Sequence, residues 1–365
     1  MSTRFFGRLL ITLALSANAF AGGDIAAGAR GPNTPPGTGP TLFHPGSLVV
    51  LPDDGRLVYF EAFAAARREI RIEICVLEDP FILQSLQDAI KRGVRVRVVV
   101  DSGKYHALPA EQYNLAQYVT DAGAELHLSN PIFPRSFPKV ILIDDNRAVV
   151  GSACLDSTTF AQYRDYAYVT DVPGVVRDLA RLFENDWKHS AAPGRAAPTY
   201  NPTPAVNRPE VIVAPVNSTS RLVAFIQGAR RTRDVTSELL GNPTLESELA
   251  AAVAGGVAVR LIAPKIVNGA PAEVQALQSA SLAALAAAGV SVHVTLLPEN
   301  PQTPYMHART GIADGRRAYL GSISLAPDSA TDNRGVGLLL EKRDVVDKLQ
   351  EQFDIDFATK SHAWE

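Results

Sequence analysis

The sequence contains few side chains of the kinds that bind metals or form disulfides. It has two cysteines, Cys75 and Cys154, no Cys-x-x-Cys pair, and seven histidines that are scattered along the chain. We therefore expect neither a metal site nor a cofactor. Both cysteines lie in apolar stretches that are typical of strands. A single disulfide and two buried free thiols are both compatible with this pattern.

An excess of positive charge is also missing. Charged residues make up 20% of the 365 residues, and the formal net charge is −3. A general nucleic-acid binder usually carries a basic surface, so this balance argues against nucleic acid as a partner and leaves only a local basic groove open. The hydrophobic content of 46% suits two domains of ordinary size or one large duplicated domain.

The N-terminal apolar run, Leu9 to Leu15, is too short for a comfortable membrane span. Two arginines precede it, and Ala19-Phe20-Ala21 forms an A-x-A cleavage site. This pattern predicts a signal peptide over residues 1–21, cleaved after Ala21, and a secreted or periplasmic protein; an uncleaved anchor is the alternative. Residues 22–41 are rich in glycine and proline and are interpreted as a disordered leader.

A second proline-rich stretch, residues 191–209, reads as a linker between two halves, residues 42–190 and 210–364. Each half repeats the same order of apolar strands and amphipathic helices, with glycine turns leading into β-branched runs. Repeated αβ units predict an α/β fold in which each half is an α/β/α sandwich. We expect the halves to share one central cleft.

Two stretches, one in each half, match at a constant offset of 170 residues. The later stretch contains His307, Arg309, Asp314, Gly321-Ser322 and Asn333-Arg334-Gly335. The earlier stretch contains Phe137, Lys139, Asp144, Gly151-Ser152 and Arg164-Asp165. One copy therefore has a histidine and no later carboxylate, and the other has a carboxylate and no histidine.

The residue types of the later stretch suit phosphoryl chemistry. His307 and Arg309 are two residues apart on a predicted strand and so point to the same face. A histidine can attack an electrophile or transfer a proton near neutral pH, and an arginine can bind phosphate through two hydrogen bonds. The small pair Gly321-Ser322 would let an anion approach the backbone closely.

The paired stretches resemble the H-x-K-x4-D and G-S motifs of the phospholipase D superfamily, and the resemblance covers both halves. It implies two α/β halves with one active site and a phosphodiesterase that forms a phosphohistidine without a metal. The implied substrate is a phospholipid or another phosphodiester, which is hydrolysed or transferred to an alcohol. We also expect peripheral contact with a membrane surface and a monomeric protein.

The resemblance implies roles for individual residues. His307 and Asp165 would be catalytic, and Asp144 and Asp314 would be structural. The phosphate contacts would come from Lys139, Arg309, Ser152, Ser322 and Asn333. For the two serines, small residues in tight turns are an equal alternative.

Four departures from the family pattern affect the chemistry. Phe137 replaces the first histidine, Arg309 the second lysine, and Gly335 the acidic residue after Asn-Arg, while Cys154 and Ser324 replace the asparagine of G-S-x-N. A phenyl ring can neither attack phosphorus nor give a proton. In the family, a carboxylate of each half is thought to hold the histidine of the other. Asp165 would then orient His307, so the retained residues form one pair and the lost residues form the other.

Three functions remain open: an exported phosphodiesterase, an impaired relative that binds a phosphate-bearing ligand or a partner, and an exported nuclease. Loss of a general acid would lower the rate by roughly 10²–10⁴. His106, Tyr105, Glu78 and Glu238 lie near predicted strand ends and are candidates to replace it.

Overall fold

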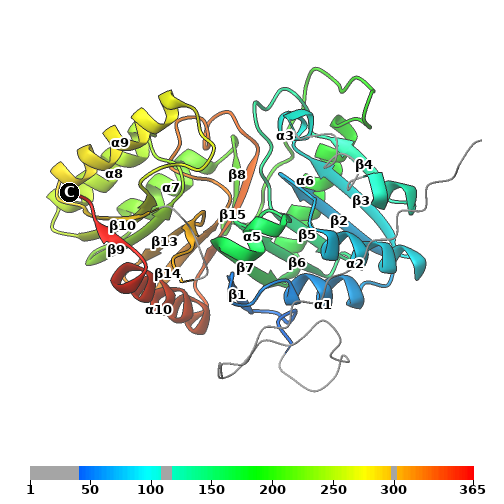
Figure 1. Cartoon of the computed structure of the whole chain (residues 1–365), viewed down its shortest axis with the longest axis horizontal. Coiled ribbons are helices and arrows are strands. Elements are labelled where there is room, and N and C mark those ends of the chain that lie inside the picture. The colour runs from blue at the N-terminus through cyan, green and yellow to red at the C-terminus, as the bar shows by residue number, and fades with distance from the viewer. Residues whose placement is uncertain (1–40, 108–116, 297–301) are drawn as a thin grey trace, which may run out of the picture. The chain divides into compact units, whose positions relative to one another are not determined.

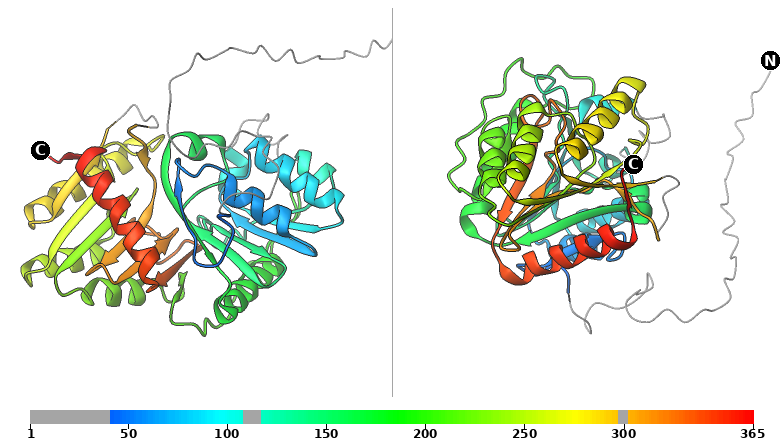
Figure 2. Two further views of the ribbon diagram at one scale, coloured as in Figure 1. Left: turned by 90° about the horizontal axis from the view of Figure 1, so that it is seen from below. Right: turned by 90° about the vertical axis from the view of Figure 1, so that its left-hand side faces the viewer.

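The computed structural model describes residues 41–107, 117–296 and 302–365. The expected signal peptide and all but the last residue of the leader fall on residues 1–40, outside this part of the chain. The described residues form two mixed sheets that lie side by side, one for each half (Figures 1 and 2). The expectation of a duplicated α/β fold is confirmed.

The first sheet has the order β1-β7-β6-β5-β2-β3-β4, and a further strand, β12, pairs with β7. Strands β2, β3 and β4 are parallel, and β5 runs antiparallel to β2. The strands are β1 (Leu48–Leu51), β2 (Glu69–Ile74), β3 (Arg95–Val100), β4 (Glu125–Leu128), β5 (Val140–Ile143), β6 (Arg147–Gly151), β7 (Tyr163–Thr170) and β12 (Tyr305–Met306).

The second sheet repeats this order as β16-β11-β10-β9-β13-β14-β15-β8. Its parallel strands are β9, β10 and β11, and β13 runs antiparallel to β9. The strands are β8 (Val211–Ala214), β9 (Thr232–Ser237), β10 (Ala258–Pro264), β11 (Ser291–Thr295), β13 (Arg309–Ala313), β14 (Arg317–Gly321), β15 (Gly335–Leu340) and β16 (His362–Ala363).

Two counterpart helices, α2 and α8, begin at side-chain caps. Asp79 accepts hydrogen bonds from two backbone N–H groups at the start of α2, and Asn242 does the same for one at the start of α8. A proline follows each cap at the first helical position, where its missing N–H costs nothing. The helices are α1 (Leu57–Ala65), α2 (Pro80–Lys91), α3 (Ser102–Ala107), α5 (Ser157–Gln162), α6 (Pro173–His189), α7 (Ser218–Gln227), α8 (Pro243–Ala254), α9 (Ala272–Ala287) and α10 (Arg343–Thr359).

Three apolar cores hold these layers together. One lies between the first sheet and α1 and α2, and another between the second sheet and α7, α8 and α9. The third joins the halves, because it combines side chains of both sheets with those of α6 and α10. Each sheet is therefore covered on both faces.

Within the motif stretches, each residue of the first half corresponds to the residue 170 positions later in the second half. In the segments that run from β2 to Asp79 and from β9 to Asn242, which come earlier in each half, the corresponding residues are 163 positions apart. The halves also exchange backbone pairs. Tyr305–Met306 pairs with Tyr163–Arg164, and at the counterpart place Phe137 N donates to Arg334 O at 2.8 Å. This exchange brings the motif of one half beside the last motif strand of the other.

One smaller expectation has a clear outcome. Cys75 and Cys154 form a disulfide, which settles the choice that the sequence left open. Residues 191–209, the expected linker, contain neither a helix nor a strand apart from a bridge between Ala191 and Leu128. None of the described helices has the length and apolar character needed to cross a membrane.

Candidate active site

The centre of the site is a histidine of one half held by a carboxylate of the other. His307 Nδ1 lies 2.7 Å from Asp165 Oδ2, and both side chains are buried. The backbone pairing of β12 with β7 creates this contact, since His307 N donates to Arg164 O at 3.3 Å. When Nδ1 carries the proton, it donates to Asp165, and Nε2 is the nitrogen whose lone pair can attack an electrophile.

Ser152 fixes the other oxygen of this carboxylate. Its hydroxyl donates to Asp165 Oδ1 and accepts from Tyr166 N at 3.1 Å. On the opposite side, the ring of Tyr163 lies 5.3 Å from the ring of His307. The orientation of the imidazole is therefore set by groups on β7 and on the turn that precedes α5.

Arg309 supplies the positive charge next to His307. Its Nη1 donates to His307 O at 2.8 Å and lies 3.2 Å from His307 Nε2, and its Nη2 forms an ion pair with Glu238. Glu238 also lies 3.6 Å from His307 Nε2 and accepts from Tyr305 Oη at 3.1 Å. Burial alone would raise the pKa of Glu238, but the charges of His307 and Arg309 outweigh it and lower that pKa.

Glu238 is thus a part of the site that the motif did not include. One feature of the sequence indicated that Glu238 belongs to the site: it lies near the end of a predicted strand, and it directly follows β9, which ends at Ser237. Its position against Nε2 and its lowered pKa make it a poor proton donor, although it was a candidate for that role. It is instead the counter-charge of Arg309.

Lys139 lies in the first half, next to the disulfide. Its Nζ is 3.4 Å from Cys75 Sγ, 3.5 Å from Phe137 O and 5.2 Å from the centre of the Phe137 ring. Burial and the nearby charge of Arg309 lower the pKa of Lys139 to about 7, although Asp165 and Glu238 act in the other direction. The two motif cations therefore differ: Arg309 has a carboxylate partner, whereas Lys139 has none within ion-pair distance among the described residues.

The motif position that lacks a histidine is occupied by a packed side chain, Phe137. Phe137 packs at the edge of the first-half core. Without a carboxylate at position 335, Ser322 donates to Val336 O at 3.1 Å and accepts from Val336 N at 3.0 Å. Neither serine therefore directs a free hydroxyl donor at the site.

Asn333 lies at the entrance to β15, directly before Arg334, whose backbone pairs with Arg135 and Phe137. It is therefore placed on the Phe137 side of the site, and its Oδ1 is buried without a hydrogen-bond partner. The structure brings His307, Asp165, Arg309 and Ser152 together, whereas Ser322 and Asn333 belong to the half-site that lost its histidine.

Asp144 and Asp314 hold backbone at the far ends of β5 and β13. Each carboxylate accepts three backbone N–H groups: those of residues 67–69 for Asp144 and of residues 230–232 for Asp314. Burial would raise the pKa of each carboxyl, but these hydrogen bonds outweigh it and lower both pKa values. These contacts are structural.

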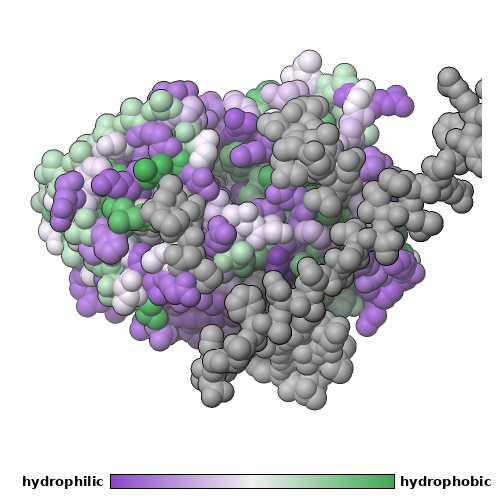
Figure 3. Space-filling view, viewed as in Figure 1, coloured by the Kyte–Doolittle hydropathy of each residue, from purple (hydrophilic) through white to green (hydrophobic). Residues whose placement is uncertain are grey.

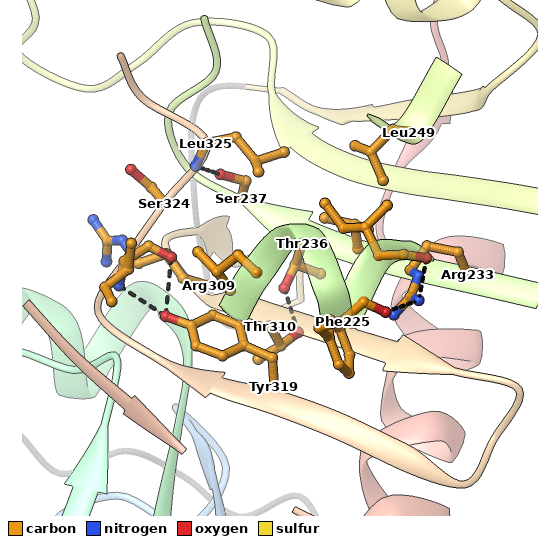
Figure 4. Close-up of a pocket in the computed structure, with 15 residues that line it drawn as sticks. Phe225, Arg233, Thr236, Ser237, Leu249, Arg309, Thr310, Tyr319, Ser324 and Leu325 are labelled. Carbon is orange, nitrogen blue, oxygen red and sulfur yellow. Dashed lines mark hydrogen bonds between the residues drawn. The ribbon is translucent and has the colours of Figure 1, made fainter. Parts of the chain in front are cut away.

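A small cavity, with a volume of about 40 Å³, is lined in part by Arg309; Figure 4 shows the side chains around it. Its lining is mostly apolar and comes from the second-half core, with Arg233 at the far end, where it donates to the carbonyls of Phe225 and Ile226. His307 does not line this cavity, so it is a gap in the packing of the core rather than the place for a substrate. The described residues include no group of three or more His, Cys, Asp or Glu side chains that could hold a metal ion.

The other candidate acids lie elsewhere or cannot be described. The side chain of His106 is outside the described part of the structure, and Tyr105 has partners of its own. Burial, followed by the charge of Asp156, raises the pKa of Glu78, but the charges that act on it belong to neither motif. His127 and His293 stack on Trp187 and Phe357, away from the motif residues.

A duplicated α/β fold with one buried His–Asp pair and two cations from different halves defines a class of phosphoryl-transfer proteins. A family model described as "Cardiolipin synthase, PLD-like domain" matches residues 59–187 and 222–357. The chain therefore belongs to the phospholipase D superfamily, as the motif predicted.

Curated relatives and solved structures agree with this assignment. Cardiolipin synthase A of Pseudomonas putida is 27% identical over 136 residues, which is 37% of this chain and 28% of that protein. The match thus spans less than a third of the relative. Phosphatidylserine synthase of Haemophilus influenzae has a TM-score of 0.67 at 12% identity, over 87% of both chains. Polyphosphate kinase of Porphyromonas gingivalis has a TM-score of 0.60 at 18% identity, over 87% of this chain and 48% of that one. These two structures show the shared fold alone.

Proposed function

We propose that this chain is an exported phosphodiesterase that cleaves phosphodiester bonds of phospholipids through a phosphohistidine on His307. The observation that carries the proposal is the hydrogen bond of 2.7 Å between His307 and Asp165. A buried carboxylate that holds Nδ1 sets the tautomer and stabilises the charge that develops when Nε2 attacks phosphorus. Arg309 lies beside Nε2, where it can bind the phosphate oxygens once Glu238 releases it.

The family model and the curated relative support a phospholipid substrate, since both carry the name of cardiolipin synthase. Either water or an alcohol could accept the phosphoryl group from His307. We propose hydrolysis as the main reaction and transfer as an alternative outcome of the same intermediate.

Contact with a lipid surface is part of the proposal. Exposed apolar side chains follow the carboxyl ends of parallel strands in both halves, at Phe81, Ile132, Ile266 and Leu296. The carboxyl ends of parallel strands share one edge of a sheet, and this is also the edge at which Glu238 follows β9. The face shown in Figure 3 is otherwise mixed and mainly hydrophilic, so the contact would be peripheral.

Export is proposed from the N-terminal pattern of Arg4, Arg8 and the run Leu9 to Leu15. A disulfide between Cys75 and Cys154 supports an oxidising compartment. The acidic net charge of −3 weighs against a nuclease, which incubation with plasmid DNA at low salt would test.

The test is to trap the intermediate. The mature chain is incubated briefly with bis(p-nitrophenyl) phosphate, quenched in base and analysed by intact mass and peptide mapping. We expect release of p-nitrophenol and an acid-labile p-nitrophenylphosphoryl group on His307. His307→Ala should form no adduct, whereas His44→Ala, which alters an exposed histidine, should behave as wild type. Asp165→Asn should slow adduct formation by roughly 10²–10⁴.

An impaired, ligand-binding relative is the second candidate, and one observation favours it. Glu238 forms an ion pair with Arg309 and lies near His307 Nε2. Its carboxylate therefore occupies the place beside Arg309 and Nε2 where a substrate phosphate would have to bind. If this candidate is right, wild type and His307→Ala will bind a glycerophosphodiester equally well in calorimetry, and neither will release an alcohol. Turnover that depends on His307 would exclude it.

A further inference from the structure

The two motif cations face different groups at counterpart positions. Subtracting the offset of 163 from Glu238 gives Cys75, and subtracting 170 from Ser324 gives Cys154. In the second half, Glu238 therefore pairs with Arg309. In the first half, Lys139 instead meets the sulfur of Cys75, which the disulfide keeps from becoming a thiolate. One cation has a counter-charge and the other has none at the same place.

Lys139 is also buried more completely than an ammonium group ordinarily is without a partner. Its exposed fraction is 5%, and no carboxylate of the described residues lies within ion-pair distance of its Nζ. The charged groups around it are Arg309 and Lys104, which oppose its positive charge, and Asp165 and Glu238, which favour it from a distance. An amine in this setting can exchange a proton near neutral pH, whereas an arginine cannot.

The ammonium lies close to the place of the missing histidine. Phe137 stands where the family has its first histidine, and Lys139 Nζ lies 5.2 Å from the centre of the Phe137 ring. If a histidine replaced Phe137, its ring nitrogens would lie at the edge of the ring that Phe137 now occupies. The amine of Lys139 therefore lies over the phenyl ring of Phe137, which cannot donate a proton as a histidine ring could.

On the basis of the proposed function, we propose that Lys139 is the proton donor to the leaving alcohol in this site. His307 Nε2 attacks phosphorus as the bond from phosphorus to the leaving oxygen breaks, and a proton of the Lys139 ammonium passes to that oxygen. The neutral amine then takes a proton from the water that attacks phosphorus. The bond from phosphorus to Nε2 breaks in that second step, so histidine and ammonium are both restored.

Other acidic groups of the site suit this role less well. Glu238 is paired with Arg309 and lies on the nucleophile side, 3.6 Å from Nε2. Tyr305 already donates to Glu238, and burial, followed by the charge of Glu238, raises the pKa of Tyr305 strongly. Burial, followed by the charge of Asp165, likewise raises the pKa of Tyr59.

The experiment compares two leaving groups in Lys139→Arg, which keeps the positive charge but cannot release a proton. Bis(p-nitrophenyl) phosphate has a leaving group that needs little protonation, and a short-chain phosphatidylcholine has an alkyl leaving group that needs a proton. We expect Lys139→Arg to lose roughly 10²–10⁴ more of the alkyl rate than of the aryl rate. The matched control Arg309→Lys should change both rates by a similar factor.

A measurement on wild type alone gives an independent check. Its alkyl rate should fall as the pH rises through about 7, because the ammonium is lost, while its aryl rate should not fall there. A Lys139→Arg variant that keeps the alkyl rate, or loses both rates equally, would overturn the proposal and leave a simple phosphate clamp. A wild type that cleaves neither diester faster than His307→Ala would overturn the proposed function and, with it, this proposal.

Discussion

The closed half-site depends on two residues, Gly335 and Ile323, that lie close together. A Cβ atom built on Gly335 would lie 2.9 Å from Ile323 Cγ1, which is closer than packed carbon atoms tolerate. The counterpart of Ile323 is Ala153, which has a smaller side chain. The larger side chain at position 323 therefore fills the space that a carboxylate at position 335 would need.

This crowding predicts how the lost half-site can be rebuilt. Phe137→His with Gly335→Asp should change the alkyl-diester rate little, because Ile323 leaves no room for the new carboxylate. Adding Ile323→Ala should raise kcat on short-chain phosphatidylcholine by roughly 10–100-fold, as a held imidazole becomes a second proton donor. Equal rates for the double and the triple variant would contradict this account of the space.

At the scale of elements, each motif aspartate fastens one strand to its neighbour. Asp144 and Asp314 have backbone φ angles of 51° and 52° and accept the first N–H groups of β2 and β9. A short carboxylate tolerates this left-handed conformation better than most side chains and can reach the backbone from it. The motif aspartate therefore sets where β2 and β9 start, and with them where Cys75 and Glu238 end up.

Replacement of either aspartate should cost stability rather than chemistry. Asp144→Ala leaves three backbone donors without their acceptor and should lower the free energy of unfolding by roughly 1–3 kcal/mol, measured with urea. Asp144→Asn should lose less, since its amide oxygen can still accept. The folded variants should keep the formation rate of the His307 adduct, and a selective loss of that rate would assign Asp144 a part in the site.

At the scale of the whole molecule, two buried ion pairs tie the halves together. Arg164 pairs with Asp356 at 2.8 Å, and its counterpart Arg334 pairs with Asp186 at 2.9 Å, with both carboxylates related by the offset of 170. Each pair joins an arginine of one half to the last long helix of the other. Arg164 also donates to Leu51 O at 2.6 Å.

Removing one partner of such a pair leaves an arginine charge in the core. Among the described residues, Arg164 then keeps only the exposed Asp53 as a counter-charge, so Asp356→Ala should destabilise the protein by roughly 1–3 kcal/mol, measured by chemical unfolding. The double variant Arg164→Met with Asp356→Leu should lose less, because no unpaired charge remains. If Asp356→Ala unfolds at the wild-type urea concentration, the pair does not hold the halves together.

The sequence predicted the fold well because each half repeats its periodicities and turn residues. The strands, the capped helices and the duplication follow from local patterns that need no long-range information. The pairing of His307 with Asp165 was also expected, but only through the family pattern. The role of Glu238 could not be predicted from the sequence. It depends on the contact with Arg309, which is 71 residues away along the chain and is brought next to Glu238 only by folding.

The sequence by itself determined the α/β halves, their duplication and the set of groups available for phosphoryl chemistry. Only the tertiary structure decided how the two motif cations differ and whether the cysteines join. The reason is that charge and proton affinity depend on neighbours in space. The disulfide of Cys75 beside Lys139 and the carboxylate of Glu238 beside Arg309 meet their cations only when distant strands pair.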